Sequence, residues 1–341
     1  MACYTLYVAH APENHSIVPR FGIVLPNRGP IIETTTVEEL LEGASHAEAG
    51  GWDSVWVGDS LLAKPRLDAI SLLGALAATT RTVWLGVACM ASLPLRHPVE
   101  LAHQWATLDL ISGGRMILGA CQGGGPGSGE FDAELSAFGV DRRDRSRRLE
   151  ETIDVLRALW AGDEVSHQGE FWSFEGVSVY PKPAQRRPPI WVAANPDLAK
   201  PRNVASALGR VARLGDGWQT THSHPDEVSK MLAIIGELAA EHGRHLDSEF
   251  PVCVTLNLSL GESREEAMAE AKRFLDRHSL TDYTADFLAK WVAAGTPTDC
   301  AEFAARYVEA GATWLLFRPV GRGLVDQIDQ ASEELLPLLR P

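Results

Sequence analysis

The chain has 341 residues, of which 45% are hydrophobic, and a formal net charge of −14. This composition supplies a large core, and the lack of a basic stripe argues against nucleic acid or an anionic membrane surface as a partner. We find no apolar run long enough to span a bilayer and no leader with a cleavage site, and the five cysteines are unpatterned. We therefore expect a cytoplasmic protein with reduced thiols and no membrane association.

The first elements are predicted by their capping residues. Residues 1–20 show no pattern and are expected to form an N-terminal arm before a domain that covers residues 21–341. RFGIVLP is a strand, and a helix follows from Thr36, because a glutamate three residues later completes a capping box. DSVWVGDS is the second strand, and Asp68 is a plausible cap for the next helix.

The stretch 82–125 contains two apolar runs, VWLGVACM and RMILGACQ, with a helix between them that opens at Pro98. A strand, a helix and a second strand predict parallel pairing. Both runs close on small residues, and ligands bind at the carboxyl ends of parallel strands. The two strand ends therefore leave room for a large, flat cofactor.

The second half of the chain completes the pattern. Residues 163–189 contain alternating residues, glycines and prolines, which predicts a small hairpin insertion. PPIWVAAN, DGWQTT, PVCVTLNLSL and WLLFRP are the fifth to eighth strands, separated by helices. Eight such units predict a single (β/α)8 TIM barrel with the hairpin after its fourth strand-helix unit. An open doubly wound sheet is the runner-up, but no G-x-G-x-x-G follows the first strand.

Several collinear segments together resemble the luciferase-like monooxygenase superfamily of flavin- or deazaflavin-dependent oxidoreductases. They are GWDSVWVGDS, TVWLGVACMASLPLRHPVELAHQWATLDLISGGRMILGA, RRLEETIDVLRALW, PPIWVAANP, RVARLGDGW and GTPTDCAEFAARYVEAGATWLLF. The resemblance implies a barrel, usually dimeric, that holds FMN or the deazaflavin coenzyme F420 at the strand carboxyl ends. It also implies that helices 68–80 and 97–111 form the homodimer interface.

The resemblance implies cofactor-binding residues after four strands. After the second strand the family usually has an acidic residue and a histidine, and here these positions are Asp59 and Ser60. Serine is a poor general acid near pH 7, so proton transfer at this position is in doubt. The other positions that the resemblance assigns to the cofactor are Ala88, Cys89, Gln122, Gly123, Gly124, Ala194, Asn195 and, through helix-start amides that could receive a phosphate, Asn203.

One backbone feature is implied by deazaflavin-using relatives. In many of them a non-proline cis peptide after the third strand supports the coenzyme ring, and by position it would be Ala88–Cys89 here. An ordinary trans strand with small residues chosen for packing is the alternative.

Three residues at later strand ends are candidates to contact substrate, namely Trp218, His222 and Arg318. An arginine at the end of an apolar strand is costly unless paired, and its partner is either an anionic substrate group or a neighbouring carboxylate. A tryptophan at the position of Trp218 is more often a core residue than a ligand contact. His222 and His224 have the spacing of a metal pair, but no third ligand is placed by spacing, so we expect no metal.

Three functions follow from the resemblance. The first is an FMN monooxygenase that oxidises a small organic substrate with reduced flavin and oxygen, supplied by a separate flavin reductase. The second is a coenzyme F420-dependent oxidoreductase that transfers hydride. The third is a non-catalytic flavin-binding barrel. Asp59, Ser60 and Arg318 are the candidates for catalysis, although no residue is assigned a proton-transfer role.

Overall fold

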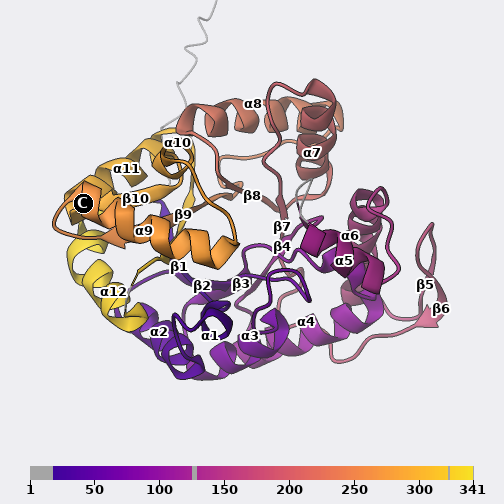
Figure 1. Cartoon of the computed structure of the whole chain (residues 1–341). Coiled ribbons are helices and arrows are strands. Elements are labelled where there is room, and N and C mark those ends of the chain that lie inside the picture. Colours follow the sequence, from indigo (N-terminus) through magenta and orange to yellow (C-terminus); the bar gives the residue numbers. More distant parts are fainter. Residues whose placement is uncertain (1–17, 125–128, 322, 341) are drawn as a thin grey trace, which may run out of the picture.

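The computed structural model describes residues 18–124, 129–321 and 323–340. Eight parallel strands close into a barrel, with β9 paired to both β8 and β11 (Figure 1). The strands are β1 (Arg20–Leu25), β2 (Ser54–Val57), β3 (Trp84–Val87), β4 (Met116–Ala120), β7 (Ile190–Ala193), β8 (Gly217–Thr221), β9 (Val252–Leu260) and β11 (Trp314–Pro319). The predicted TIM barrel is confirmed, with every barrel strand in a predicted segment. Residues 1–17 of the expected N-terminal arm lie outside the described residues.

A further strand, β10 (Val292–Gly295), pairs in parallel with the carboxyl half of β9, from Asn257 to Leu260. This strand was not predicted, since only helices were expected between the seventh and eighth strands and VAAG is short and carries no alternation. Its pairing extends the sheet beyond the neighbouring ends of β8 and β11.

Helices surround the barrel, and their caps match the sequence signals. Thr36 and Glu39 form the capping box, and Asp68 accepts from the Ser71 amide at 2.8 Å. The helices are α1 (Gly29–Ile32), α2 (Val37–Ala49), α3 (Ala69–Thr79), α4 (Pro98–Ser112), α5 (Gly129–Ala137), α6 (Arg145–Ala161), α7 (Pro201–Leu214), α8 (Pro225–Glu241), α9 (Arg264–Ser279), α10 (Ala285–Ala289), α11 (Pro297–Glu309), α12 (Leu324–Gln330) and α13 (Leu336–Leu339). Among the described residues, no helix combines the length and apolarity needed to cross a membrane.

The insertion forms an antiparallel hairpin, β5 (Val165–Gln168) and β6 (Ser173–Val177), as predicted. Figure 1 places it at the periphery, outside the ring of strands. Glu151 of α6 holds the hairpin, since its carboxylate accepts from the amides of Phe171 and Trp172 at 3.0 and 2.9 Å.

The barrel interior has a floor of three tryptophans, Trp56, Trp191 and Trp314. Their ring centroids lie 5.0–6.5 Å apart. Because side chains alternate along a strand, residues two positions further on share the interior face and lie nearer the carboxyl ends. These residues are small on β2 and β7, where they are Gly58 and Ala193. The interior side chains are therefore small on these two strands above the tryptophan floor, at the carboxyl ends of the strands, which we call the mouth of the barrel.

Candidate active site

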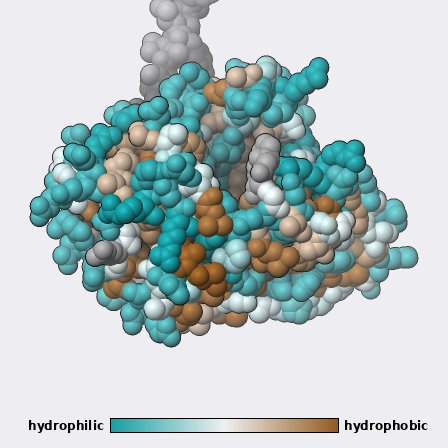
Figure 2. Space-filling view, viewed as in Figure 1, coloured by the Kyte–Doolittle hydropathy of each residue, from teal (hydrophilic) through white to brown (hydrophobic). Residues whose placement is uncertain are grey.

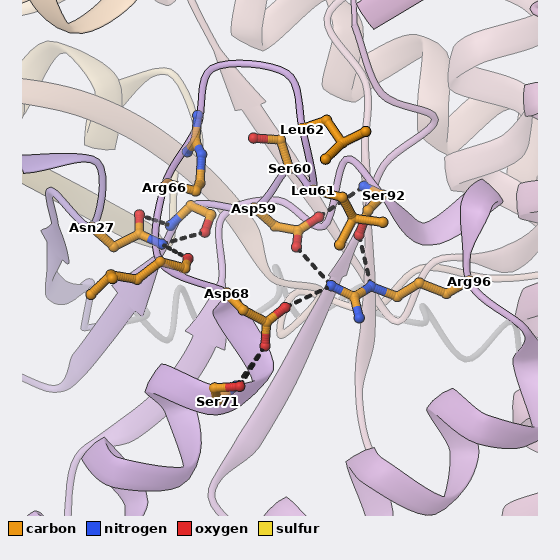
Figure 3. Close-up of polar contacts among 12 residues, drawn as sticks. Asn27, Asp59, Ser60, Leu61, Leu62, Arg66, Asp68, Ser71, Ser92 and Arg96 are labelled. Atoms are coloured by element: carbon orange, nitrogen blue, oxygen red, sulfur yellow. Dashed lines mark hydrogen bonds and ion pairs between the residues drawn. The ribbon is translucent and has the colours of Figure 1, made fainter. Parts of the chain in front are cut away.

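Asp59, directly after β2, is buried and already bonded within the protein. Its Oδ2 accepts from the Ser92 amide at 2.8 Å, and its Oδ1 accepts from Nη2 of Arg96 at 3.3 Å (Figure 3). Arg96 also pairs with Asp68 at 3.2 Å. The carboxylate therefore anchors the loop after β3, which is a structural task beside the predicted contact with a cofactor.

Ser60 occupies the position where the family usually has a histidine, and it is 3% exposed. Its hydroxyl donates to the Lys64 carbonyl oxygen at 3.4 Å. The same loop is held from α5, because Glu134 accepts from the amides of Leu61 and Leu62 at 2.6 and 2.7 Å. The loops after β2 and β4 are thus joined at the mouth.

The ends of β3 and β4 meet at the position predicted for the coenzyme ring. The Ala88–Cys89 peptide is cis, as expected. The Cys89 thiol donates a hydrogen bond to Cys121, which raises the pKa of Cys89 and lowers that of Cys121. A Cβ on Gly119 would overlap the Val87 carbonyl oxygen, so the strands approach closely here.

The loop after β4 has a fixed backbone where the structure describes it. Gly123 has φ +76°, and a Cβ there would lie 2.6 Å from the Ala91 carbonyl oxygen, which requires glycine. Arg145 at the start of α6 donates to the carbonyls of Gly123 and Gly124 at 2.8 and 2.7 Å. Gln122 accepts from the Ser146 hydroxyl at 2.5 Å. The predicted loop is therefore preformed.

The segment after β7 is less well suited to phosphate than expected. Ala194 accepts from the Trp218 indole at 2.8 Å, and the Asn195 amide donates to the Thr221 carbonyl at 3.1 Å. Asn203 is exposed, but its own N–H donates to the Lys200 carbonyl at 2.9 Å. Pro201 has no N–H to offer, so the start of α7 presents fewer free amides than the sequence suggested.

Trp218 lies in the core, with 0% of its surface exposed. The next residue, Gln219, pairs in register with Cys253, which lies in the interior of the barrel. Because side chains alternate along a strand, Trp218 points outward, away from the barrel interior. The substrate contact predicted for it has no support in this geometry. Gln219, which the sequence analysis overlooked, is 3% exposed and takes the interior position instead.

Polar atoms without partners collect on the interior side of the mouth. Within the described residues, no hydrogen bond is made by Oε1 of Gln219, by either side-chain polar atom of Asn257 or by Nε2 of His222. Buried polar groups are normally hydrogen-bonded, so each of these atoms calls for a ligand or a water. A flat, heteroatom-rich ring would provide partners for Gln219, and a second polar ligand would provide them for Asn257 and His222. The site is compatible with a flavin or deazaflavin.

His222 lies against the Trp291 ring, with centroids 4.1 Å apart. Burial, together with the charges of Arg318, Lys290 and Lys64, lowers the pKa of His222 to about 3, so the imidazole is neutral at pH 7. His224 is exposed and caps α8. Among the described residues, no group of three or more His, Cys, Asp or Glu could hold a metal.

Arg318 has no ion pair or hydrogen bond within the described residues. On β11 it follows Trp314 and Leu316 at intervals of two, so it projects into the interior above the floor, in register with Asn257 on β9. Burial and the charge of Arg66 lower the pKa of Arg318 to about 10. Three further cations, Arg28, Lys64 and Arg66, follow β1 and β2. These three residues were not predicted from the sequence, although all of them lie in the segments that follow the first two strands.

The chain matches the sequence profile described as luciferase-like monooxygenase over residues 19–314. A coenzyme F420-dependent glucose-6-phosphate dehydrogenase of Amycolatopsis mediterranei is 28% identical over 330 residues, covering 89% of this chain and 94% of that protein. The oxygenase component of a flavin-dependent trigonelline monooxygenase of Acinetobacter baylyi is 34% identical over 245 residues, covering 69% of this chain and 62% of that protein.

Solved structures share the fold. A coenzyme F420-dependent secondary alcohol dehydrogenase in complex with an F420–acetone adduct superposes with a TM-score of 0.80 at 18% identity, covering 95% of this chain and 99% of that chain. The long-chain alkane monooxygenase LadA superposes with a TM-score of 0.72 at 16% identity, covering 94% of this chain and 91% of that chain. At these identities the likeness extends to the barrel alone.

Proposed function

The chain belongs to the luciferase-like monooxygenase family and is an oxidoreductase of that type, and we propose that it transfers hydride between coenzyme F420 and a small organic substrate. The observation that carries this choice is the length of the match to the F420-dependent dehydrogenase, which covers 94% of that relative. Members of the family work with F420 or with a flavin, so the inactive barrel is set aside.

The coenzyme, when bound, exchanges a hydride with a carbon atom of the substrate. We assign its binding to the arc formed by the ends of β3, β4 and β7, with Cys89, Gln122, Gly123 and Asn195 along it. Asp59 contributes by holding the loop after β3 in place. Gln219 supplies an interior amide without a partner for its oxygen.

His222 rather than Ser60 is the hydrogen-bonding group offered to the substrate in this proposal. The Ser60 hydroxyl already donates to a carbonyl, whereas His222 is neutral and its Nε2 has no partner within the described residues. Negative charge that develops on a substrate oxygen is stabilised by the nearby cations Lys64 and Arg318. Asp59 and Ser60 then serve to position the loops.

A second candidate is an FMN monooxygenase, which is favoured by the 34% identity to the trigonelline oxygenase component. Such a component works with reduced flavin, so a separate flavin reductase is the partner to expect. The same residues would surround the flavin.

Titration of the purified protein with F420, reduced F420, FMN and reduced FMN, followed by tryptophan quenching, separates the two candidates. We expect F420 to bind at least tenfold more tightly than FMN. Anaerobic turnover is the second arm, because hydride transfer needs no oxygen. Tighter binding of reduced FMN, with oxygen-dependent turnover, would replace the first candidate by the second.

We also propose a homodimer through α3 and α4. The last turn of α4 exposes Leu110 and Ile111 by 46% and 51%, an apolar surface that a twin subunit would cover. Sedimentation at micromolar concentration tests this, and a monomer would contradict it.

A further inference from the structure

The chain carries a net charge of −14, yet the mouth gathers four cations on one arc of the barrel. Arg28 follows β1, Lys64 and Arg66 follow β2, and Arg318 ends β11, three strands that are consecutive in the sheet. We call these four residues the cation arc. Among the described residues, no carboxylate forms an ion pair with any of them.

Arg28 is the most telling member of the cation arc. It is 3% exposed, and within the described residues its Nε and Nη1 have no hydrogen-bond partner. A buried charge without a partner is strongly unfavourable, so such an arrangement persists where a ligand completes it. Its charge reaches Lys64 and Arg66, and it lowers the pKa of both, after burial and other neighbouring charges. The four cations therefore form one electrostatic site.

The nearby carboxylates do not neutralise this site. Asp59 is engaged by Ser92 and Arg96, and Glu134 by two backbone amides. Glu130 acts on Arg28 and Lys64 through its charge alone. In Figure 3, Arg66 and Arg96 lie on opposite sides of Asp59. Arg96 forms the ion pair with this carboxylate, whereas Arg66 interacts with it through charge alone.

An aromatic wall stands beside the cation arc. Tyr283 and Phe287 stack with centroids 5.0 Å apart, and Trp291 meets both rings edge-on. The ring centroid of His222 lies 5.2 Å from that of Phe287 and 4.1 Å from that of Trp291, and Tyr283 lies near enough to Arg318 to raise its pKa slightly against the effect of burial. The buried side chain of Asn257, without partners, lies in register with Arg318. Figure 2 shows a hollow near the centre of this face.

We propose that the substrate is a small organic anion with a planar, apolar body, whose carboxylate or phosphate is held by the cation arc and whose body lies against the aromatic wall. This inference rests on the proposed function only in taking the mouth as the substrate site. The coenzyme residues of β3, β4 and β7 lie on the neighbouring arc of the barrel.

Calorimetric titration of the coenzyme-loaded protein with benzoate, phenyl phosphate, benzamide and inorganic phosphate tests the proposal without turnover. We expect benzoate or phenyl phosphate to bind at least tenfold more tightly than benzamide, and the preferred one of the two identifies the anionic group. Equal binding of benzoate and benzamide, or tightest binding of inorganic phosphate, would overturn it. Loss of benzoate binding on coenzyme addition would also overturn it, because the cations would then belong to the coenzyme.

Arg318→Gln is the principal variant, and Lys64→Gln is a second, less buried one in case the first fails to fold. Each should weaken benzoate binding about tenfold and leave coenzyme affinity unchanged. Arg20→Gln is the matched control, because Arg20 is an exposed arginine at the opposite end of β1, over the Trp314 ring. An equal loss in the control and the test variants would contradict the proposal. Since coenzyme titration is read separately, failure of the substrate class and failure of the proposed function can be told apart.

Discussion

The arginines at the two ends of the barrel differ in whether their side chains have hydrogen-bond and ion-pair partners. At the amino end, Arg115 donates to four carbonyl oxygens and a hydroxyl, and Arg157 and Arg187 share the carboxylate of Asp216. At the mouth, Arg28 and the rest of the cation arc have no ion pair within the described residues. Satisfied cations stabilise a fold, whereas unsatisfied ones are kept at the expense of stability where function needs them.

The largest expected effect is at the amino end. Arg115→Met removes the donors that satisfy the carbonyls of Ser112, Val83, Thr80 and Ala77, and it should lower the free energy of unfolding by about 3 kcal/mol. Urea unfolding followed by circular dichroism measures the change. Arg143→Met, at a fully exposed arginine, is the control and should leave stability unchanged. If Arg115→Met lost no more stability than this control, the arginines at the amino end would not stabilise the fold as proposed.

Asp59→Asn tests a well-satisfied cation at the mouth, Arg96. Asparagine keeps an acceptor for the Ser92 amide but leaves Asp68 as the only carboxylate paired with Arg96, so the free energy of unfolding should fall by about 2 kcal/mol. Because the loop after β3 loosens, coenzyme affinity should fall as well. Unchanged unfolding and unchanged coenzyme titration together would show that the pair contributes little.

The pH dependence of stability sharpens the comparison. The pKa of His222 is lowered to about 3, so between its unfolded value and about 3 the unfolded chain binds a proton that the folded chain does not. Stability therefore falls as the pH drops below about 6.5. From pH 7 to pH 5, His222→Gln should lose about 1–2 kcal/mol less than the wild type in urea unfolding. Parallel losses in both proteins would contradict a buried, neutral His222.

The smallest expected change in the free energy of unfolding is an increase, at Arg28. Arg28→Met removes a buried charge that has no partner at Nε and Nη1, and the free energy of unfolding should rise by about 1 kcal/mol. Benzoate binding should weaken in the same variant. A loss of stability would show that Arg28 is satisfied in the folded protein, and the contrast between the two ends would disappear.

Features that involve residues close in the sequence were predicted, whereas features that depend on how distant segments pack were not. The capping box at Thr36 and the cap at Asp68 were predicted because they involve residues within one helical turn. Trp218 could not be oriented from the sequence, because parallel barrel strands are buried on both faces and DGWQTT gives no alternation from which to orient a side chain. Arg28, Lys64 and Arg66 were missed because they lie beyond turns whose paths depend on tertiary contacts, such as the Asn27 amide bonded to Gly58 and Leu67.

The bonds from Glu134 to the amides of Leu61 and Leu62 bear on loop exchange between relatives. Grafting the segment after β2 alone would bring in amides without this acceptor, and grafting α5 alone would bury a carboxylate without donors. Residues 58–67 and 129–137 thus behave as one cassette. A library that recombines substrate-facing loops of this barrel should vary the two together, with the chain between them left as scaffold.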